Sequence, residues 1–237
     1  MDSSIYFSNY VIHESNLRMQ DLDSLVRCVA MAVAKTRKTS VKKARESVYR
    51  SLVLDAAERV FAKKGYDGAK IKDVADEAGL ALGTVYTIYP SKHDVFIAVH
   101  ERRGGALLAT VVDAITGIES PYDALAHGLV VTCRFYAAHP DYLRMHLGSG
   151  TAWAAPKLDV PEEQRVYRAG RAPLVALFER AASRADAACE PAETSASLFL
   201  AAMQVYFSEW VEGKFVMLPE EVAERVAGYV KRALIVG

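Results

Sequence analysis

The stretch that decides the fold is "AGLALGTVYTIYPSKHD", residues 78–94, which carries few charges and places a glycine inside a predicted helix. Apolar spacing predicts short helices at residues 71–78 and 82–88, joined by the turn "AGLA". Gly79 supplies the positive φ that such a tight turn often requires. Two short helices joined in this way are typical of a helix-turn-helix, in which the second helix lies in the major groove of DNA.

The residues on both sides of this motif also have helical spacing. One apolar stripe precedes it at positions i, i+4, i+7 and i+8: Val53, Ala57, Val60 and Phe61. Gly65 follows that stripe and predicts the end of the first helix. After the motif, Ser91 and Asp94 have the S-x-x-D spacing of a capping box, which predicts a long helix that ends near Thr116.

The rest of the chain is punctuated by prolines and predicts an all-α body. Further helices are expected near residues 121–138, 141–148, 162–184, 192–213 and 220–235. Pro173 falls within the third of them and predicts a kink or a break. No strand-like alternation of useful length occurs. We therefore expect an N-terminal three-helix helix-turn-helix domain at residues 45–98, fused to a larger helical ligand-binding and dimerisation domain at residues 99–237.

Residues 1–44 differ from the remainder, and we expect them to form a flexible extension and basic arm. Residues 1–20 are polar with scattered aromatics, and a short apolar helix is predicted at residues 22–34. Two alternatives stay open: either Met31 is the working start and the preceding residues are an upstream extension, or they form a genuine N-terminal helix. N-terminal sequencing of the natively expressed protein distinguishes them, because a product that starts at Met1 excludes the first.

The net charge is zero, but its distribution along the chain is uneven. Residues 35–103 have a balance of +6, whereas residues 1–34 and 104–237 have balances of −2 and −4. A basic segment joined to an acidic one predicts a polyanion site on one part only. The basic arm before the first helix is expected to contact the DNA backbone or minor groove, and the alternative is a solvated tail. Its cations are Lys35, Arg37, Lys38, Lys42, Lys43 and Arg45.

Secreted, membrane and disulfide-stapled proteins are disfavoured by the composition. The three cysteines, Cys28, Cys133 and Cys189, have neither a metal-binding spacing nor a disulfide framework, and they fit a reducing compartment. No stretch approaches the roughly 20 apolar residues of a membrane span, and no signal peptide is convincing. We therefore expect a cytoplasmic protein with no membrane partner.

The motif resembles the DNA-binding domain of the TetR family of bacterial repressors. The matching features, in order and without a gap, are Gly65-Tyr66, Val74-Ala75, Ala78-Gly79-Leu80, Gly83-Thr84-Val85-Tyr86, Tyr89 and Ser91-Lys92. With the preceding helix, the resemblance covers about residues 45–99. A lone helix-turn-helix pattern is weakly specific, whereas this ordered set is strongly specific.

The resemblance implies a role for each matching position. Residues 82–88 would be the recognition helix, and Gly83 would let its backbone approach the DNA closely. Tyr86 would give its hydroxyl to a phosphate, and Lys92, in the first turn of the next helix, would support the same phosphate region. The full set of expected DNA contacts is Lys70, Lys72, Leu82, Gly83, Thr84, Tyr86, Thr87 and Lys92.

Three positions depart from the family pattern. Lys70 and Ala81 stand where the family usually has a capping Thr or Ser, and each lost cap costs about 1 kcal/mol. Ile88 stands where a polar or aromatic residue is common, so one backbone contact is in doubt. The recognition helix also has no Arg, Asn or Gln for a bidentate contact with a base, so it does not reveal the operator sequence. Tyr66 and Tyr89 are expected to lie in the core.

The resemblance also implies a small-molecule site and a dimer interface in the helical body. We expect a small, apolar or aromatic effector to contact Tyr142, Met145, His146, Trp153, Phe178 and Phe207. The helix predicted at residues 192–213 is apolar on almost every side and must therefore be covered all round. In the family the last two helices form a four-helix bundle with a second subunit, and burial within a monomer is the alternative.

An enzyme, a metal site or a cofactor has no support in the sequence. His127, Cys133, His139 and His146 are spaced by 6, 6 and 7 residues, which does not return them to one helical face. The "GSG" at residues 148–150 lacks the G-x-S-x-G pattern of a nucleophilic serine, and no phosphate-binding glycine motif occurs.

We therefore predict a ligand-responsive, homodimeric repressor of a palindromic operator. The competing hypothesis is an all-helical ligand-binding or interaction module with a degenerate head, which Lys70, Ala81 and Ile88 favour. A gel shift on the DNA upstream of its own gene discriminates between the two.

Overall fold

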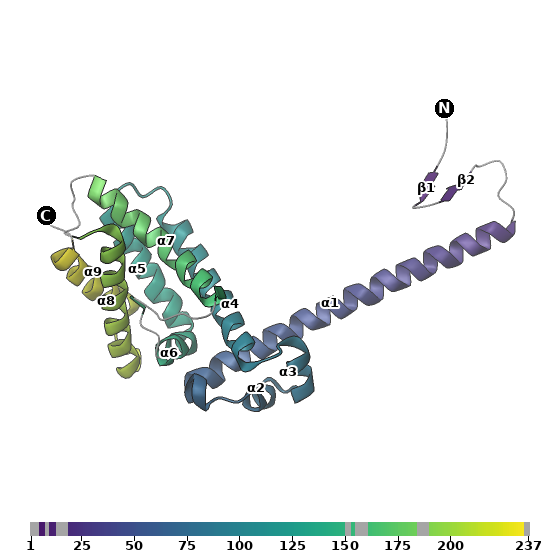
Figure 1. The fold of residues 1–237 in the computed structure, drawn as a ribbon, viewed down its shortest axis with the longest axis horizontal. Helices are drawn as coiled ribbons and strands as arrows, with labels where there is room; N and C mark the ends of the chain where they lie inside the picture. Colours follow the sequence, from purple (N-terminus) through teal and green to yellow (C-terminus); the bar gives the residue numbers. More distant parts are fainter. Residues whose placement is uncertain are drawn as a thin grey trace. The chain divides into compact units, whose positions relative to one another are not determined.

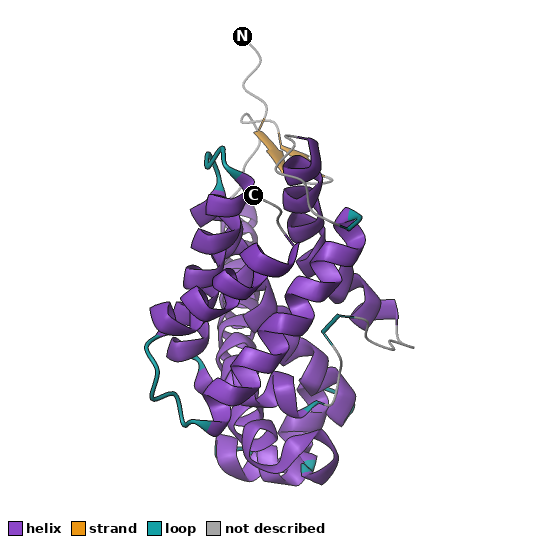
Figure 2. Cartoon of the chain, turned by 90° about the vertical axis from the view of Figure 1, so that its left-hand side faces the viewer, coloured by secondary structure: helices purple, strands orange, loops and turns teal. Residues whose placement is uncertain are grey.

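The computed structural model describes residues 5–7, 10–12, 19–149, 153–154, 161–183 and 190–234, and helices make up nearly all of this part of the chain (Figure 2). Its elements in chain order are β1 Ile5–Phe7, β2 Tyr10–Ile12, α1 Met19–Gly68, α2 Ile71–Ala78, α3 Leu82–Ile88, α4 Lys92–Ile115, α5 Pro121–Ala138, α6 Pro140–Gly148, α7 Pro161–Ser183, α8 Ala192–Glu212 and α9 Pro219–Leu234. The predicted all-α class is confirmed, although the short β1–β2 pair was not expected.

Contacts along the chain divide it into two units, Met1–Arg50 and Ser51–Gly237. In the first unit, β1 and β2 pair antiparallel, with Ile5 opposite Ile12. Residues 19–50 belong to α1 (Figure 1), so the arm that we expected to be flexible is helical from residue 19 onward. Whether these residues are an upstream extension stays open.

The second unit begins with the end of α1, where Gly65 interrupts the helical geometry as predicted. Its φ of 70° and ψ of 170° are accessible to glycine but strained for other residues. The helices α2 and α3 have the predicted bounds, and Gly79 takes a φ of 65° in the turn between them. The apolar stripe of α1 is buried, as are Val85 and Tyr89, and these residues belong to one core cluster that continues into the body.

The helix α4 starts as its sequence predicts. The Ser91 hydroxyl accepts a hydrogen bond from the Asp94 backbone N–H and caps the helix, which then runs to Ile115. The predicted division between residues 98 and 99 therefore falls inside one helix and inside the second unit. As a functional division between head and body, it stays a prediction.

The body helices begin and end within one residue of the predicted bounds. Of the kink or break expected at Pro173, the break is wrong, because α7 continues through this residue from Pro161 to Ser183. Helix α5 contacts α4, α7 and α9, and α8 contacts α7 and α9, which gives the bundle seen in Figure 1. Large side chains fill its interior: Leu143, Met145, Phe178, Phe207 and Trp210.

None of the helices within the described ranges combines the length and the apolar character needed to cross a bilayer.

Candidate nucleic-acid interface and effector cavity

Helix α3 has one buried face and one exposed face. Val85 is fully buried, and Ile88 packs against the same core. On the opposite side, Leu82 is 41% exposed and Tyr86 is 48% exposed, and Gly83 and Thr87 are exposed beside them. Positions i, i+1, i+4 and i+5 share one side of a helix, so α3 presents these four residues together. The structure thus brings together four of the eight predicted DNA contacts.

Gly83 lies in the middle of this exposed face without a reason in the fold. A Cβ built at this position would meet no atom within 4 Å, and its φ is not in the positive range. Glycine in a helix costs about 0.5–1 kcal/mol relative to alanine. The open space at Gly83 would allow a surface outside this chain to approach closely, and DNA contact at this residue stays a prediction.

The remaining predicted contacts are less uniform. Lys70 and Lys72 are exposed at the start of α2, whereas Thr84 is only half exposed. The Thr87 hydroxyl donates to the Gly83 carbonyl over 2.8 Å, so its methyl group and the acceptor capacity of its oxygen are left for a partner. These placements are compatible with DNA contact, which stays a prediction for each of these residues.

The missing cap at Lys70 is partly replaced. The lysine side chain has no acceptor, but the Asp73 carboxylate accepts from the Lys70 backbone N–H over 3.0 Å. Asp73 also pairs with Lys64 over 2.9 Å, and these hydrogen bonds, that of Lys64 foremost, lower the pKa of the Asp73 carboxyl. At the start of α3, Ala81 makes no side-chain cap, as the sequence predicts.

Lys92 makes contacts within the chain. Its ammonium group donates to the backbone carbonyls of Tyr66, Asp67 and Ala69 over 2.8, 3.4 and 3.2 Å. It also lies 4.4 Å from the centre of the Tyr66 ring. Lys92 therefore joins the start of α4 to the end of α1 and the residue after it, and its contact with a phosphate stays a prediction.

A continuous chain of rings follows Lys92 along α4. Tyr66 and Phe96 have ring centres 4.8 Å apart, and Phe96 and His100 have ring centres 4.5 Å apart. His100 in turn lies 5.2 Å from His146 of α6. Because Lys92, Phe96 and His100 are spaced by four residues, one face of α4 touches both the helix-turn-helix and the body.

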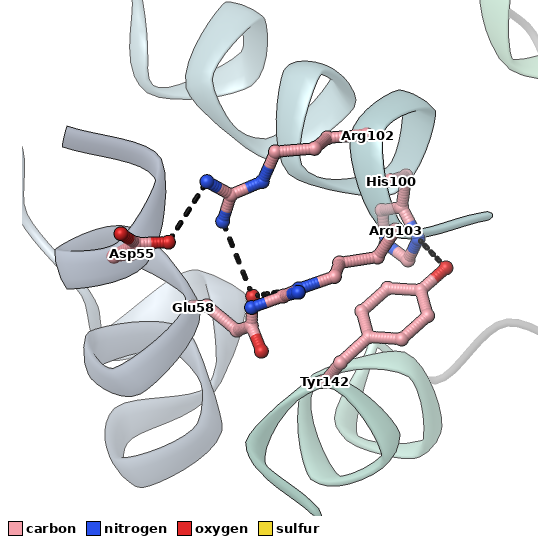
Figure 3. A network of polar contacts seen from close by, with 6 residues as sticks. All are labelled: Asp55, Glu58, His100, Arg102, Arg103 and Tyr142. Carbon is pink, nitrogen blue, oxygen red and sulfur yellow. Dashed lines mark hydrogen bonds and ion pairs between the residues drawn. The ribbon is translucent and has the colours of Figure 1, made fainter. Parts of the chain in front are cut away.

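An ion-pair network lies beside these rings, as Figure 3 shows. Arg103 donates to the Glu58 carboxylate over 2.7 Å, and Arg102 approaches the same carboxylate at 3.4 Å. Arg102 also pairs with Asp55 at 2.8 Å. Glu58 is only 5% exposed, so its charge is held almost out of water by these two cations. Removing the partners of a buried carboxylate strongly destabilises the folded protein. This contact therefore favours one arrangement of α1 and α4.

A cavity of about 680 Å³ lies within the body, between α4, α5, α6, α7 and α8. From α4 it is lined at intervals of three or four residues, by Phe96, His100, Gly104, Leu108, Val111 and Ile115. Gly104 leaves room for Tyr142, because a Cβ at residue 104 would lie 3.3 Å from the Tyr142 hydroxyl. The lining is mainly apolar and aromatic, which is typical of small-molecule sites.

Two histidine–tyrosine pairs supply the polar groups of this cavity. The Tyr142 hydroxyl lies 3.4 Å from His100 Nδ1 (Figure 3), and the Tyr136 hydroxyl lies 3.2 Å from His146 Nδ1. Burial lowers the pKa of His100 to about 3, with the neighbouring His146 as a further cause, and burial lowers that of His146 to about 4. Both imidazoles are therefore neutral at physiological pH.

The predicted effector contacts divide into two groups. Tyr142, His146 and Trp153 line the cavity. Met145, Phe178 and Phe207 do not; they are 2%, 0% and 0% exposed and belong to the packed core. The sequence shows that these six residues have large side chains, five of them aromatic rings, but not which way each one faces.

The residues that α4 contributes to the cavity lining were not predicted from the sequence. His100 was the signal available, because it is a polar residue on the same face as Phe96 and Gly104. Among the described residues, no three His, Cys, Asp or Glu side chains gather as metal ligands would.

A family model described as bacterial regulatory proteins, tetR family, matches residues 53–99. This segment comprises the end of α1, the helices α2 and α3 and the start of α4, and so contains the whole exposed face of α3.

Curated proteins match a part of the chain. The HTH-type transcriptional repressor AcnR of Corynebacterium diphtheriae is 32% identical over 81 residues, which are 34% of this chain and 42% of that protein. A fatty acid metabolism regulator protein of Bacillus subtilis is 29% identical over 83 residues, or 35% and 42% of the two chains. The chain spans about a third to a half of the curated relatives it matches, between 34% and 51% in three of them.

Solved structures match over most of the chain. The regulator FadR from Bacillus subtilis in complex with stearoyl-CoA aligns with a TM-score of 0.66 at 15% identity and covers 76% of this chain and 96% of that one. A tetR-family regulatory protein from Rhodococcus RHA1 aligns with a TM-score of 0.65 at 20% identity, over 80% and 98%. At sequence identities of 15% and 20%, these matches show a similar fold and nothing more. The match at residues 53–99 shows that this segment is a DNA-binding domain of the TetR family of bacterial regulatory proteins, and most of the chain has the fold of solved regulators of that family.

Proposed function

We propose that the chain is a DNA-binding transcriptional regulator that acts as a homodimeric repressor of a palindromic operator. A small apolar or aromatic effector that binds in the body cavity would release it from the operator. The relatives include proteins named as transcriptional repressors, and one of the similar structures holds stearoyl-CoA, which supports the general class of function.

The observation that carries the DNA-binding part is the exposed face of α3. Leu82 and Tyr86 project large side chains into solvent, on either side of a glycine that no neighbour requires. In the helix-turn-helix geometry this helix enters the major groove, where apolar side chains contact thymine methyl groups and hydroxyls reach phosphates. If α3 had no partner outside the chain, alanine at residue 83 would stabilise this helix more than the glycine does.

The dimer is supported by apolar residues that α8 and α9 leave exposed. Leu198, Val205 and Tyr229 are between 41% and 58% exposed, although their helices otherwise pack closely in the body. A second copy of this chain, seated on α8 and α9, would cover these side chains in a four-helix bundle. It would also present two α3 helices to the two halves of a palindrome.

The release step is supported by the contacts of α4. This helix lines the cavity with Phe96 and His100, and it holds the helix-turn-helix through Lys92 and the Arg102–Arg103 pair. An effector that binds more tightly when α4 is in one arrangement than in another would shift the equilibrium between these two arrangements. The shift is limited by that difference in affinity.

A mobility-shift assay on the DNA upstream of the gene tests this function. The wild-type chain is expected to shift a fragment that contains a palindrome, and Tyr86→Phe is expected to weaken binding with the same sequence preference, because it removes a phosphate contact. Asp113→Asn, on the exposed far end of α4, serves as the surface control. Failure of the wild-type chain to shift any such fragment at low salt would support the alternative of a ligand-binding module with a degenerate head.

A further inference from the structure

The body cavity contains little charge for a site of its size. Among its described lining residues, only Glu101 and Arg171 carry a formal charge at neutral pH. Arg171 is paired with Glu193 and donates to the Ser197 hydroxyl over 2.8 Å, and Glu101 is mostly exposed. The interior wall is therefore close to neutral.

The two buried histidines offer hydrogen-bonding groups without charge. Nδ1 of each ring is used by a tyrosine hydroxyl, that of Tyr142 for His100 and that of Tyr136 for His146. Within the part of the chain that the structure describes, Nε2 of neither ring is hydrogen-bonded to another residue. Both residues line the cavity, so these nitrogens are available to a ligand. So are Nε1 of Trp153 and Nε of Arg171 in the same lining, which are buried and have no hydrogen-bond partner among the described residues.

Aromatic rings surround this pair of histidines. His146 is stacked on Trp153 with ring centres 4.5 Å apart, and Tyr136 and Tyr142 are stacked at 5.8 Å. Phe96 contacts His100 from the side of the helix-turn-helix. Such a wall favours flat, apolar molecules, because ring faces and edges pack well against other rings.

We propose that the cavity takes an uncharged, flat aromatic molecule whose single polar group hydrogen-bonds to Nε2 of His146 or His100. The proposal rests on the proposed role of the cavity as the effector site, and it adds the charge of the effector and the residues that select it. The burial that keeps both imidazoles neutral also penalises a charged ligand, since no unpaired opposite charge in the described lining would compensate it.

Four probes that share one ring system separate charge from hydrogen bonding. They are 2-naphthylmethanol, which is neutral and polar; 2-ethylnaphthalene, which has nearly the same shape but no hydroxyl; 2-naphthoate, an anion; and 2-naphthylmethylammonium, a cation. Equilibrium dialysis against the full chain at pH 7.5 measures the dissociation constant of each. DNA does not enter this measurement, so its outcome is independent of whether the chain binds an operator.

The alcohol is expected to bind best. We expect its affinity to exceed that of either charged probe at least ~10-fold, and that of 2-ethylnaphthalene by about 3- to 10-fold, the ratio that one net hydrogen bond produces. Comparable affinity for the anion or the cation would overturn the proposal, as would failure of every probe to bind.

Variants locate the hydrogen bond. The double variant His100→Leu/His146→Leu is expected to abolish the preference for the alcohol over 2-ethylnaphthalene and to keep the affinity for 2-ethylnaphthalene within ~3-fold, which also shows that the cavity has folded. His127→Gln changes an exposed histidine of α5 outside the cavity and should leave all four affinities unchanged. A preference that survives the double variant would show that the histidines do not bind the polar group.

Should the double variant not fold, the single variants His146→Gln and His100→Gln repeat the test. Glutamine keeps a hydrogen-bonding group but displaces it. At least one of these two variants is expected to reduce the preference for the alcohol several-fold, and an unchanged preference in both would equally overturn the proposal.

Discussion

At the residue scale, the molecule separates side chains that hold the fold from those that face outward. Tyr89 and Tyr86 are three residues apart in sequence, yet the first is 7% exposed and the second 48%. Lys92 is expected beside Tyr86 at the DNA, and within the chain its ammonium group donates to three backbone carbonyls at and just beyond the end of α1. Sequence spacing places a residue on a helix, whereas the contacts of its terminal atoms depend on the packing of neighbouring helices.

Gly83→Ala is expected to raise the free energy of unfolding by about 0.5–1 kcal/mol, because alanine has the higher helix propensity and meets no neighbour. Urea denaturation without DNA measures the change. Gly105→Ala is the matched control: it is also a helical glycine with open space around it, in α4, and should give a similar gain. A loss of stability in Gly83→Ala alone would mean that the fold itself requires this glycine.

Lys92→Met is expected to lower the free energy of unfolding by about 1–3 kcal/mol, since three carbonyls lose a charged donor while the aliphatic stem is kept. Lys72→Met, at an exposed position of α2, is the control and should change it by less than about 0.5 kcal/mol. Thermal and urea unfolding measure both. Equal, small effects would indicate that the Lys92 ammonium is available to a partner after all.

At the scale of elements, α4 is the helix on which the proposed mechanism depends. Its first turn is clipped to α1 by Lys92, its third turn carries His100 into the cavity, and Arg102 and Arg103 hold the buried Glu58. The start and length of α4 were predictable from Ser91, Asp94 and the following helical spacing. Its partners were not, because Glu58 and Arg103 lie 45 residues apart and no local pattern connects them.

Glu58→Gln is expected to lower the free energy of unfolding by about 1–3 kcal/mol, because the two arginines lose a buried partner. It should also reduce the effect of an effector on DNA affinity, since this contact joins α1 to α4. Asp55→Asn removes the more exposed half of the network and is expected to cost less than about 1 kcal/mol. Urea unfolding, and DNA-binding titrations with and without effector, measure both; equal effects would contradict a special role of Glu58.

At the scale of the whole molecule, the fold class and nearly all helix bounds could be predicted from apolar spacing, caps and prolines. The cavity could be predicted only in part. Tyr142, His146 and Trp153 were identified from the clustering of aromatics, but Phe178 and Phe207 are equally aromatic and face the core. Which face of a helix lines a cavity is decided by several distant helices together.

Acid is expected to destabilise the body through its buried histidines. The pKa of His146 is about 4 and that of His100 about 3 in the folded chain, against about 6.5 when unfolded. Above pH 6.5 the two imidazoles are largely unprotonated in both the folded and the unfolded chain. Below pH 6.5 the unfolded chain binds more protons on them than the folded chain does. Stability should therefore fall as the pH drops from about 6.5 toward 4. Urea unfolding at several pH values checks this, and His146→Phe should reduce the slope; an unchanged slope would contradict the burial of a neutral His146.

The dimer belongs to the same scale. Val205→Glu is expected to shift the chain from dimer to monomer, because a charge in the proposed interface would be buried without a partner. Val112→Glu places the same charge at an exposed valine of α4 and should leave the mass unchanged. Light scattering after size exclusion measures both. A wild-type chain that is already monomeric at micromolar concentration, or a Val205→Glu dimer, would contradict the proposed interface.

The central claim is that the exposed face of α3 binds operator DNA. DNase I footprinting on the DNA flanking the gene, with wild-type protein and Gly83→Ala side by side, tests it most directly. The wild type is expected to give a two-fold symmetric protected region, and at least ~10-fold more Gly83→Ala is expected to be needed for the same protection, because an added methyl keeps the helix from the groove. No protection at low salt, or the same protection by both proteins, would contradict it.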